Sequence, residues 1–141
     1  HNSIIDKVVD NHKSLGIKRA IKLPVSAPFH CRLMEKAKEN MESYIQDLEL
    51  LSPKLILVNN VGAAPLTETN KIKDSLIEQI TNTVRWRESI DNMCDLGVDN
   101  FIEIGAGNVL SGLVKRINKT VNSISIQNIE NIENYINILE G

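Results

Sequence analysis

Apolar residues recur every three or four positions in several segments of the chain, and this spacing predicts amphipathic helices. Gly16 is expected to end the first helix, whose apolar face consists of Ile4, Ile5, Val8 and Val9. Further helices are predicted over residues 33–48, 71–80, 87–97, 109–117 and 128–141. Gly97 is expected to close the helix over 87–97.

Short apolar runs between the helices predict strands at residues 17–25, 54–61, 100–105 and 123–127. Pro24 restricts the first of these to an edge or an end of a sheet, because proline has no N–H to donate. The run NFIEIG over 100–105 indicates a buried strand. Since strands alternate with helices, the predicted fold class is α/β with a mainly parallel sheet.

Polar or glycine residues stand near the ends of three predicted strands. They are His30 with Cys31, Asn59 with Asn60, and the segment 105–108. Because ligands of open α/β sheets bind at the carboxyl ends of strands, these residues are candidates for a common site.

The composition says little about the fold, but it excludes several classes of partner. The 141 residues are 42% hydrophobic and 24% charged, with a net charge of −2, which is ordinary for a globular domain. No basic stripe alternates with aromatic residues and no apolar run approaches roughly 20 residues, so neither nucleic acid nor a membrane is expected as a partner. Cys31 and Cys94 do not form a disulfide framework, so we expect a reducing, cytoplasmic setting. The chain begins inside a helical pattern, and we expect it to be part of a longer protein.

The stretch LPVSAPFHC, residues 23–31, places a histidine on a stiff junction between an apolar run and a helix. Pro24 and Pro28 restrict the approach to His30, and histidine suits general base catalysis near neutral pH. The alternative is a capping or packed histidine at a turn. A dyad with Cys31 is not favoured, because adjacent residues of extended chain point to opposite faces. The histidines and cysteines have no metal-ligand spacing, so no metal site is expected.

The segment FIEIGAGNVLSGL, residues 101–113, allows two interpretations. Glu103, Gly105 and Gly107 match the first motif of nucleotide-dependent methyltransferases, but Val109 occupies the position of its third glycine. The favoured interpretation is a tight turn in which the glycines adopt positive φ. Nearby, Trp86 is predicted to be a packing anchor, and the flanking Arg85 and Arg87 are expected to be solvated charges.

Three segments occur in the order and spacing of one known family. PVSAPFHCRLM is similar to the histidine segment P-V-S-x-P-F/S-H-x-x-L-M, and ILVNNVGAAP is similar to the strand and loop that follow it. Residues 75–117 are similar to Q-x-x-x-P-V-x-W … G-x-x-x-F-x-E-x-G-P-G-x-V-L-x-G-L. Up to about Ile117, the chain therefore resembles the malonyl-CoA:acyl carrier protein transacylases. Thr83 and Ala106 depart from the family by replacing prolines, which leaves the proposed chemistry untouched.

The resemblance implies a site that this chain supplies only in part. His30 corresponds to the catalytic base, oriented by the main-chain carbonyl of Gln79, and Asn59 and Asn60 are assigned a substrate-lining role. The family's nucleophilic serine lies in a G-H-S-x-G elbow, and no G-x-S-x-G occurs in the 141 residues. The oxyanion glutamine and the arginine that binds the malonyl carboxylate are missing too. The fragment alone is therefore expected to be inactive.

The resemblance also implies the architecture and the partners. Residues 1–22 would end a small ferredoxin-like subdomain, and residues 23–141 would form the C-terminal part of a large α/β-hydrolase-like acyltransferase subdomain. The implied partners are malonyl-CoA, acyl carrier protein and the missing N-terminal part of the same enzyme, with no cofactor. Fatty acid biosynthesis is the implied process. The alternatives are an acyltransferase domain of a polyketide or fatty-acid megasynthase, a non-catalytic binding module, and the methyltransferase named above.

Overall fold

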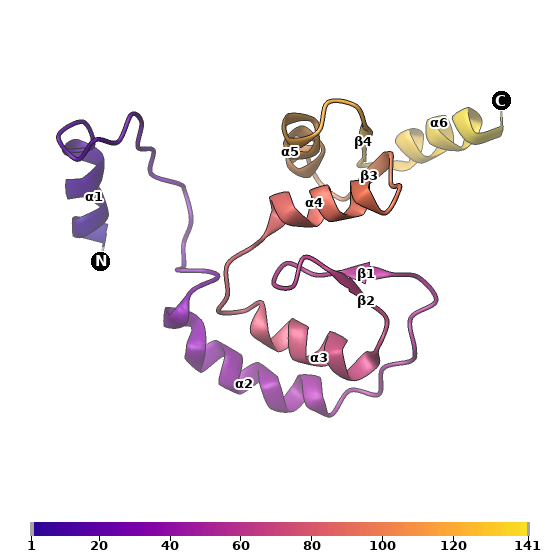
Figure 1. Ribbon diagram of the computed structural model, residues 1–141, viewed down its shortest axis with the longest axis horizontal. Helices are drawn as coiled ribbons and strands as arrows, with labels where there is room; N and C mark the ends of the chain where they lie inside the picture. Colours follow the sequence, from indigo (N-terminus) through magenta and orange to yellow (C-terminus); the bar gives the residue numbers. More distant parts are fainter. Residues whose placement is uncertain (1, 141) are drawn as a thin grey trace.

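The computed structural model describes residues 2–140, which alternate between helices and short strands (Figure 1). In chain order the elements are α1 (Asn2–Asp10), the 3-10 helix η1 (Arg32–Met34), α2 (Glu35–Gln46), β1 (Leu57–Val58), β2 (Pro65–Leu66), α3 (Thr69–Glu78), α4 (Trp86–Asp95), β3 (Asn100–Ile104), α5 (Val109–Ile117), β4 (Asn122–Ile126) and α6 (Ile129–Glu140). The fold class is α/β, as predicted. None of the helices within residues 2–140 has the length and apolar character needed to cross a bilayer.

One group of elements, here called the hairpin unit, consists of η1, α2, β1, β2 and α3. The two strands pair antiparallel, with Leu57 opposite Leu66. α2 and α3 pack against each other (Figure 1), and the buried side chains of these two helices include Ile45, Ile72 and Ile77. Apolar residues at helical spacing thus form this small core, as the periodicity predicted.

The second group, here called the sheet unit, consists of α4, β3, α5, β4 and α6. β3 and β4 pair in parallel, in register from Asn100 opposite Asn122 to Ile104 opposite Ile126. α5 connects the two strands and packs on both, while α4 packs on α5 and α6 packs on β4. This is a β-α-β arrangement. Two parallel strands need a long crossover connection, usually a helix, whereas a short turn can join only antiparallel strands.

The predicted strand over 17–25 is wrong. These residues form no strand, and the side chains of Ile21, Leu23 and Val25 are exposed. A strand exists only where a partner supplies a hydrogen-bond ladder, and here the Val25 N–H instead donates to the carbonyl of Leu23 at 2.9 Å. α1 also ends earlier than predicted, at Asp10, and the chain continues in turns to Gly16 at φ +73°.

Two further strand predictions need correction. The strand expected over 54–61 is only the two residues of β1, and its partner β2 lies where no strand was predicted. β3 is not buried: exposure alternates along it, and Ile104 is 83% exposed because α5 covers only one face. The other predicted helices and the strand over 123–127 are confirmed within a few residues at each end.

Candidate active site

His30 occupies a strained turn immediately before η1. Its φ of +57° is in the left-handed region, which is uncommon for a residue other than glycine but less so for histidine. Next to it, the Phe29 N–H donates to the Ala27 carbonyl at 3.0 Å, and the Cys31 thiol donates to the Pro28 carbonyl at 3.2 Å. Such conformations persist only where surrounding contacts determine them, and they cluster at functional sites.

The contact that holds the His30 ring comes from a helix end far away in sequence. The Nδ1 atom of His30 lies 2.8 Å from the main-chain oxygen of Gln79, the C-cap residue of α3. The last carbonyls of a helix have no partner inside the helix, so this oxygen is free to accept. The hydrogen bond that the family resemblance implied is therefore present.

This geometry assigns the protons of the imidazole. A carbonyl oxygen only accepts, so Nδ1 must carry the hydrogen and donate it to Gln79. In the neutral ring Nε2 then keeps its lone pair and becomes the nitrogen that accepts a proton. His30 is exposed, so a reacting group has access to the side chain. An exposed imidazole held in this way can act chemically as a general base.

Packing of the hairpin unit keeps the His30–Gln79 pair together. His30 precedes η1 and α2, whereas Gln79 ends α3, and these two helices pack side by side. The Nζ atom of Lys73 donates to the carbonyl of Gln46 at 2.7 Å, which ties α3 to the end of α2. The orientation of the imidazole thus depends on helix packing, not on the turn alone.

Asn59 and Asn60 lie in the loop between β1 and β2. Asn59 is buried, and its Oδ1 atom accepts from the N–H of Val61 at 2.9 Å and of Gly62 at 2.6 Å. Asn60 is half-buried, and its carbonyl accepts from the Arg85 N–H at 2.8 Å. Within residues 2–140 neither side chain is hydrogen-bonded to His30 or Gln79. The amide oxygen of Asn59 instead builds its own turn.

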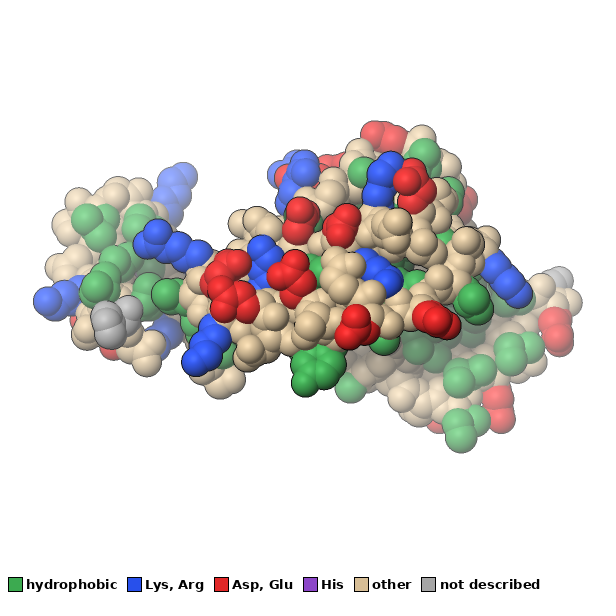
Figure 2. Space-filling model, turned by 90° about the horizontal axis from the view of Figure 1, so that it is seen from below, with side chains coloured by type: hydrophobic (Ala, Val, Ile, Leu, Met, Phe, Trp, Pro, Cys, Tyr) green, Lys and Arg blue, Asp and Glu red, His purple; other side chains and the backbone are tan. Residues whose placement is uncertain are grey.

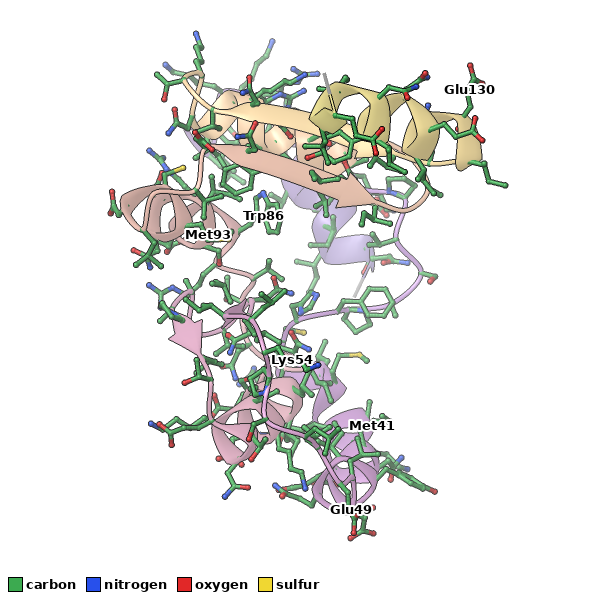
Figure 3. The ribbon with its side chains drawn as sticks, turned by 90° about the vertical axis from the view of Figure 1, so that its right-hand side faces the viewer. Met41, Glu49, Lys54, Trp86, Met93 and Glu130 are labelled. Atoms are coloured by element: carbon green, nitrogen blue, oxygen red, sulfur yellow. The ribbon has the colours of Figure 1, made fainter. Side chains whose placement is uncertain are left out.

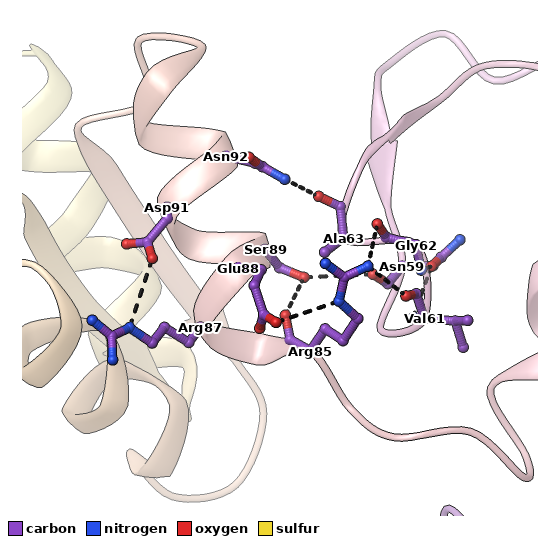
Figure 4. Close-up of polar contacts among 10 residues, drawn as sticks. All are labelled: Asn59, Val61, Gly62, Ala63, Arg85, Arg87, Glu88, Ser89, Asp91 and Asn92. Carbon is purple, nitrogen blue, oxygen red and sulfur yellow. Dashed lines mark hydrogen bonds and ion pairs between the residues drawn. The ribbon is translucent and has the colours of Figure 1, made fainter.

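Arg85 has contacts that the sequence interpretation missed. Its Nη1 atom lies 3.5 Å from the carbonyl oxygen of Val61 and 3.4 Å from that of Gly62, and its Nε atom lies 3.4 Å from Glu88 (Figure 4). Both arginines are exposed, but Arg87 is more so, and it pairs only with Asp91 on its own helix at 3.8 Å, as expected for a solvated charge. A sequence signal existed: Arg85, Ser89 and Asn92 are donors spaced along one side of a helix.

Glu103 caps α5 and leaves no open anion cradle at that helix start. Its carboxylate accepts from the N–H of Leu110 at 3.1 Å, and from the N–H and the hydroxyl of Ser111 at 2.8 Å and 2.7 Å. The Ser111 N–H and then its hydroxyl hold the pKa of Glu103 below its usual range. Gly105 and Gly107 have positive φ, so the predicted tight turn is confirmed. These contacts oppose the methyltransferase interpretation.

Trp86 lies between α4 and the sheet, as Figure 3 shows, and is half-buried. It lines a cavity of about 70 Å³ together with apolar residues that include Phe101 and Val114, as expected of a packing anchor. A larger cavity of about 320 Å³ lies between the sheet and α6. Neither cavity is lined by His30 or Gln79, so the candidate site rests on the oriented imidazole.

Comparisons with known proteins agree on one enzyme family. The chain is 44% identical over 130 residues to the malonyl CoA-acyl carrier protein transacylase of Staphylococcus aureus (strain MSSA476). The aligned region covers 92% of this chain and 42% of the relative. The crystal structure of the acyl-carrier-protein S-malonyltransferase from Bartonella henselae has a TM-score of 0.86 and 36% identity, over 97% of this chain and 44% of that one. No protein-family model matches the chain.

A further solved structure is a type II polyketide synthase acyl carrier protein in complex with its malonyl-transacylase. Its TM-score is 0.86 at 32% identity, over 95% of this chain and 43% of that one. The chain spans less than half the length of each of these three relatives. It aligns with the C-terminal part of the curated ones.

Proposed function

From the premise that this chain belongs to the malonyl-CoA:acyl carrier protein transacylase family, we propose that it supplies the general base of an acyl carrier protein S-malonyltransferase. The observation that supports the proposal is the 2.8 Å hydrogen bond between His30 Nδ1 and the Gln79 carbonyl. It leaves Nε2 as the proton acceptor on an exposed ring. The whole protein would move a malonyl group from coenzyme A to acyl carrier protein for fatty acid biosynthesis.

In the first half-reaction His30 acts on a serine from the part of the protein outside this chain. Nε2 takes the hydroxyl proton as the serine oxygen attacks the carbonyl carbon of the malonyl thioester. The carbon–sulfur bond then breaks, and the imidazolium returns the proton to the departing coenzyme A sulfur. A malonyl-serine ester and free coenzyme A result.

The second half-reaction uses the same nitrogen. Nε2 takes the proton from the phosphopantetheine thiol of acyl carrier protein, whose sulfur attacks the malonyl-serine ester. The carbon–oxygen bond breaks, and the proton goes to the serine oxygen. The relative solved as a malonyl-transacylase in complex with an acyl carrier protein supports this choice of acceptor.

The Gln79 carbonyl orients the base. In many triads a carboxylate accepts from the other ring nitrogen, sets the tautomer and stabilises the imidazolium. The Gln79 oxygen sets the tautomer equally well but brings only the partial charge of a helix C-terminus. Asn59 and Asn60 complete the proposed site as substrate-lining residues. The side chain of Asn60 suits this role better than that of Asn59, because the Asn59 side-chain oxygen already accepts two hydrogen bonds within its own turn.

The proposed domain division follows the family. Residues 1–22 would end a ferredoxin-like small subdomain, and residues 23–141 would belong to an α/β-hydrolase-like large subdomain. The position of α1 supports a boundary near residue 22, since α1 is joined to the hairpin unit through an extended segment (Figure 1).

The missing N-terminal part of the enzyme is the proposed partner for a large exposed surface. The chain exposes 11061 Å², whereas a compact monomer of this length exposes about 7,300 Å². Apolar side chains reach the surface at both ends of the molecule (Figure 2). Strands of parallel sheets are normally covered on both faces, yet Ile102 and Ile104 are 40% and 83% exposed. More than half of each relative's length is available to cover this surface.

The experiment is substitution of His30 in a full-length protein that carries this chain. His30→Ala is expected to slow malonyl-serine formation by about two to four orders of magnitude, the usual loss for a general base. His12→Ala is a matched control, because its Nδ1 atom also lies 2.8 Å from a main-chain oxygen, that of Val9. If both variants form malonyl-serine at the wild-type rate, His30 is structural and the proposal fails.

A further inference from the structure

The loop between β1 and β2 is attached to α4 through its main-chain carbonyls. The carbonyl of Asn60 accepts from the Arg85 N–H at 2.8 Å, and those of Val61 and Gly62 accept from Arg85 Nη1. Further acceptors in this loop are the carbonyl of Asn59, at 3.5 Å from Ser89 Oγ, and that of Ala63, which accepts from Asn92 Nδ2. The carbonyls of residues 60–63 thus each have a donor on α4 or at its N-cap. The Ser89 hydroxyl has a nearer acceptor, the Arg85 carbonyl at 2.9 Å, and reaches the Asn59 carbonyl only at 3.5 Å. We call residues 59–63 the carbonyl turn.

The side-chain donors lie on one side of α4. Arg85, Ser89 and Asn92 are spaced i, i+4 and i+7, which places them on the same face of a helix. Figure 4 shows them directed at the carbonyl turn, while Arg87 and Asp91 pair with each other away from it. We call Arg85, Ser89 and Asn92 the α4 donor row.

The carbonyl turn has a backbone that requires support. Ala63 has φ +50° and no exposed surface, although alanine rarely adopts the left-handed region. Asn59 Oδ1 binds two N–H groups of the turn from inside, and the donor row binds its carbonyls from outside. Both sets of main-chain groups are therefore satisfied, which fixes the loop in one conformation.

This contact also joins the two halves of the molecule. The carbonyl turn belongs to the hairpin unit, which carries the His30–Gln79 pair, and the donor row belongs to the sheet unit. The principal packing contacts run inside each unit: α2 with α3 in one, and α5 with its strands and α4 in the other. The donor row therefore lies at a junction between the two units.

We propose that Arg85, Ser89 and Asn92 are positioning residues, which hold the His30–Gln79 pair at a fixed orientation to the parallel sheet. The inference rests on the proposed function. Substrates of α/β proteins gather at the carboxyl ends of parallel strands, so a base carried by the hairpin unit must be held in register with the sheet unit. Displacing a reacting group by about 1 Å can cost about 100-fold in rate.

Arg85 is the residue of the row whose loss should matter most. Its Nη1 lies within 3.5 Å of two successive carbonyl oxygens, and Glu88 holds its Nε at 3.4 Å. A guanidinium presents several donors in a rigid plane, whereas a lysine presents a point charge on a flexible stem. Lysine should therefore replace it only in part.

The test compares residues at the N-cap and on one side of α4 with residues of the same helix that face away from the carbonyl turn. In the full-length protein, Arg85→Gln and Asn92→Asp are expected to lower kcat by about 10- to 100-fold, with KM for malonyl-CoA within about twofold of wild type. The controls are Arg87→Gln, which is the same change two positions away, and Asp91→Asn, which exchanges the same two residue types in the opposite direction at the neighbouring position. Both should leave kcat unchanged. Arg85→Lys should recover part of the loss. Urea unfolding checks that each variant is folded.

Equal kcat for Arg85→Gln and Arg87→Gln would overturn the inference. If Arg85→Gln does not fold, Arg85→Lys decides, and a wild-type kcat for it would overturn the inference as well. A loss seen in KM alone would place the row in substrate binding and contradict positioning. Failure of the proposed function looks different: there His30→Ala itself keeps its activity, whereas failure of this inference leaves His30→Ala inactive and Arg85→Gln active.

Discussion

At the scale of single residues, the orientation of the His30 imidazole depends on main-chain atoms, which substitution of a neighbouring side chain does not remove. The acceptor for His30 Nδ1 is a main-chain oxygen, and the strained φ of +57° at His30 is a backbone property. The side chain of Gln79 takes no part in that hydrogen bond. Side-chain and backbone changes at this point of α3 should therefore have different consequences.

We predict that Gln79→Ala keeps most of the transacylase activity of the full-length protein, while Ile80→Pro loses it. The proline removes the Ile80 N–H, which donates to the Ile77 carbonyl at 3.3 Å, and disfavours the helical conformation of Gln79 that presents its carbonyl. The measurement is the rate of malonyl-serine formation, with Ile80→Ala as the control for loss of the side chain. Gln79→Ala as slow as Ile80→Pro would assign the orienting role to the Gln79 side chain.

At the scale of elements, α5 begins where a carboxylate from β3 meets its free N–H groups. Helix starts favour negative charge because their first N–H groups lack partners. Glu103 supplies this charge from outside the helix and also accepts from the Ser111 hydroxyl, whose oxygen lies beside β4, 3.1 Å from the Ile124 carbonyl oxygen. One carboxylate thus couples β3, α5 and β4.

We predict that Glu103→Gln lowers the urea midpoint of unfolding at pH 7, and that the difference from wild type narrows in acid. The folded-state pKa of Glu103 is lowered, so its stabilising effect is present above the ordinary glutamate pKa of about 4.3 and is lost as pH falls through the folded value. Glu133→Gln, an exposed change on α6, is the control. A difference that stayed constant down to pH 2 would show that the charge of Glu103 contributes nothing.

At the scale of the whole molecule, the sheet unit has one covered face and one open face. Ile90 on α4 is fully buried, whereas Ile104 on β3 is 83% exposed. A two-stranded sheet is rarely stable by itself, and further strands or a covering layer are normally required. The proposed N-terminal part of the enzyme would provide this cover.

We predict that Ile104→Ala changes the free energy of unfolding of the 141-residue chain by less than about 0.5 kcal/mol, as for other exposed sites. In the full-length protein the same change should cost about 2 kcal/mol or more, because the side chain would be buried there. Ile90→Ala should cost about 2 to 5 kcal/mol in both. Urea unfolding measures all four values, and an equal effect of Ile104→Ala in both proteins would contradict the proposed cover.

The sequence by itself determined the features that depend on neighbours along the chain. Helical periodicity predicted α3 and α5, because an apolar stripe must be buried somewhere whatever its partner. Glycine spacing predicted the turn at Gly105 and Gly107, because positive φ is a property of the residue itself. The order of motifs, read through the family resemblance, also predicted the His30–Gln79 hydrogen bond across 49 positions.

Only the tertiary structure decided features that need a partner from a distant segment. Residues 17–25 have the composition of a strand but no neighbouring strand, so no ladder forms. β3 has the composition of a buried strand, but nothing within residues 2–140 covers its second face fully. The spacing of the donors Arg85, Ser89 and Asn92 is visible in the sequence, but their acceptors were hidden, because main-chain carbonyls are provided by any residue type. Main-chain partners leave no trace in the sequence, and three-dimensional proximity alone selects them.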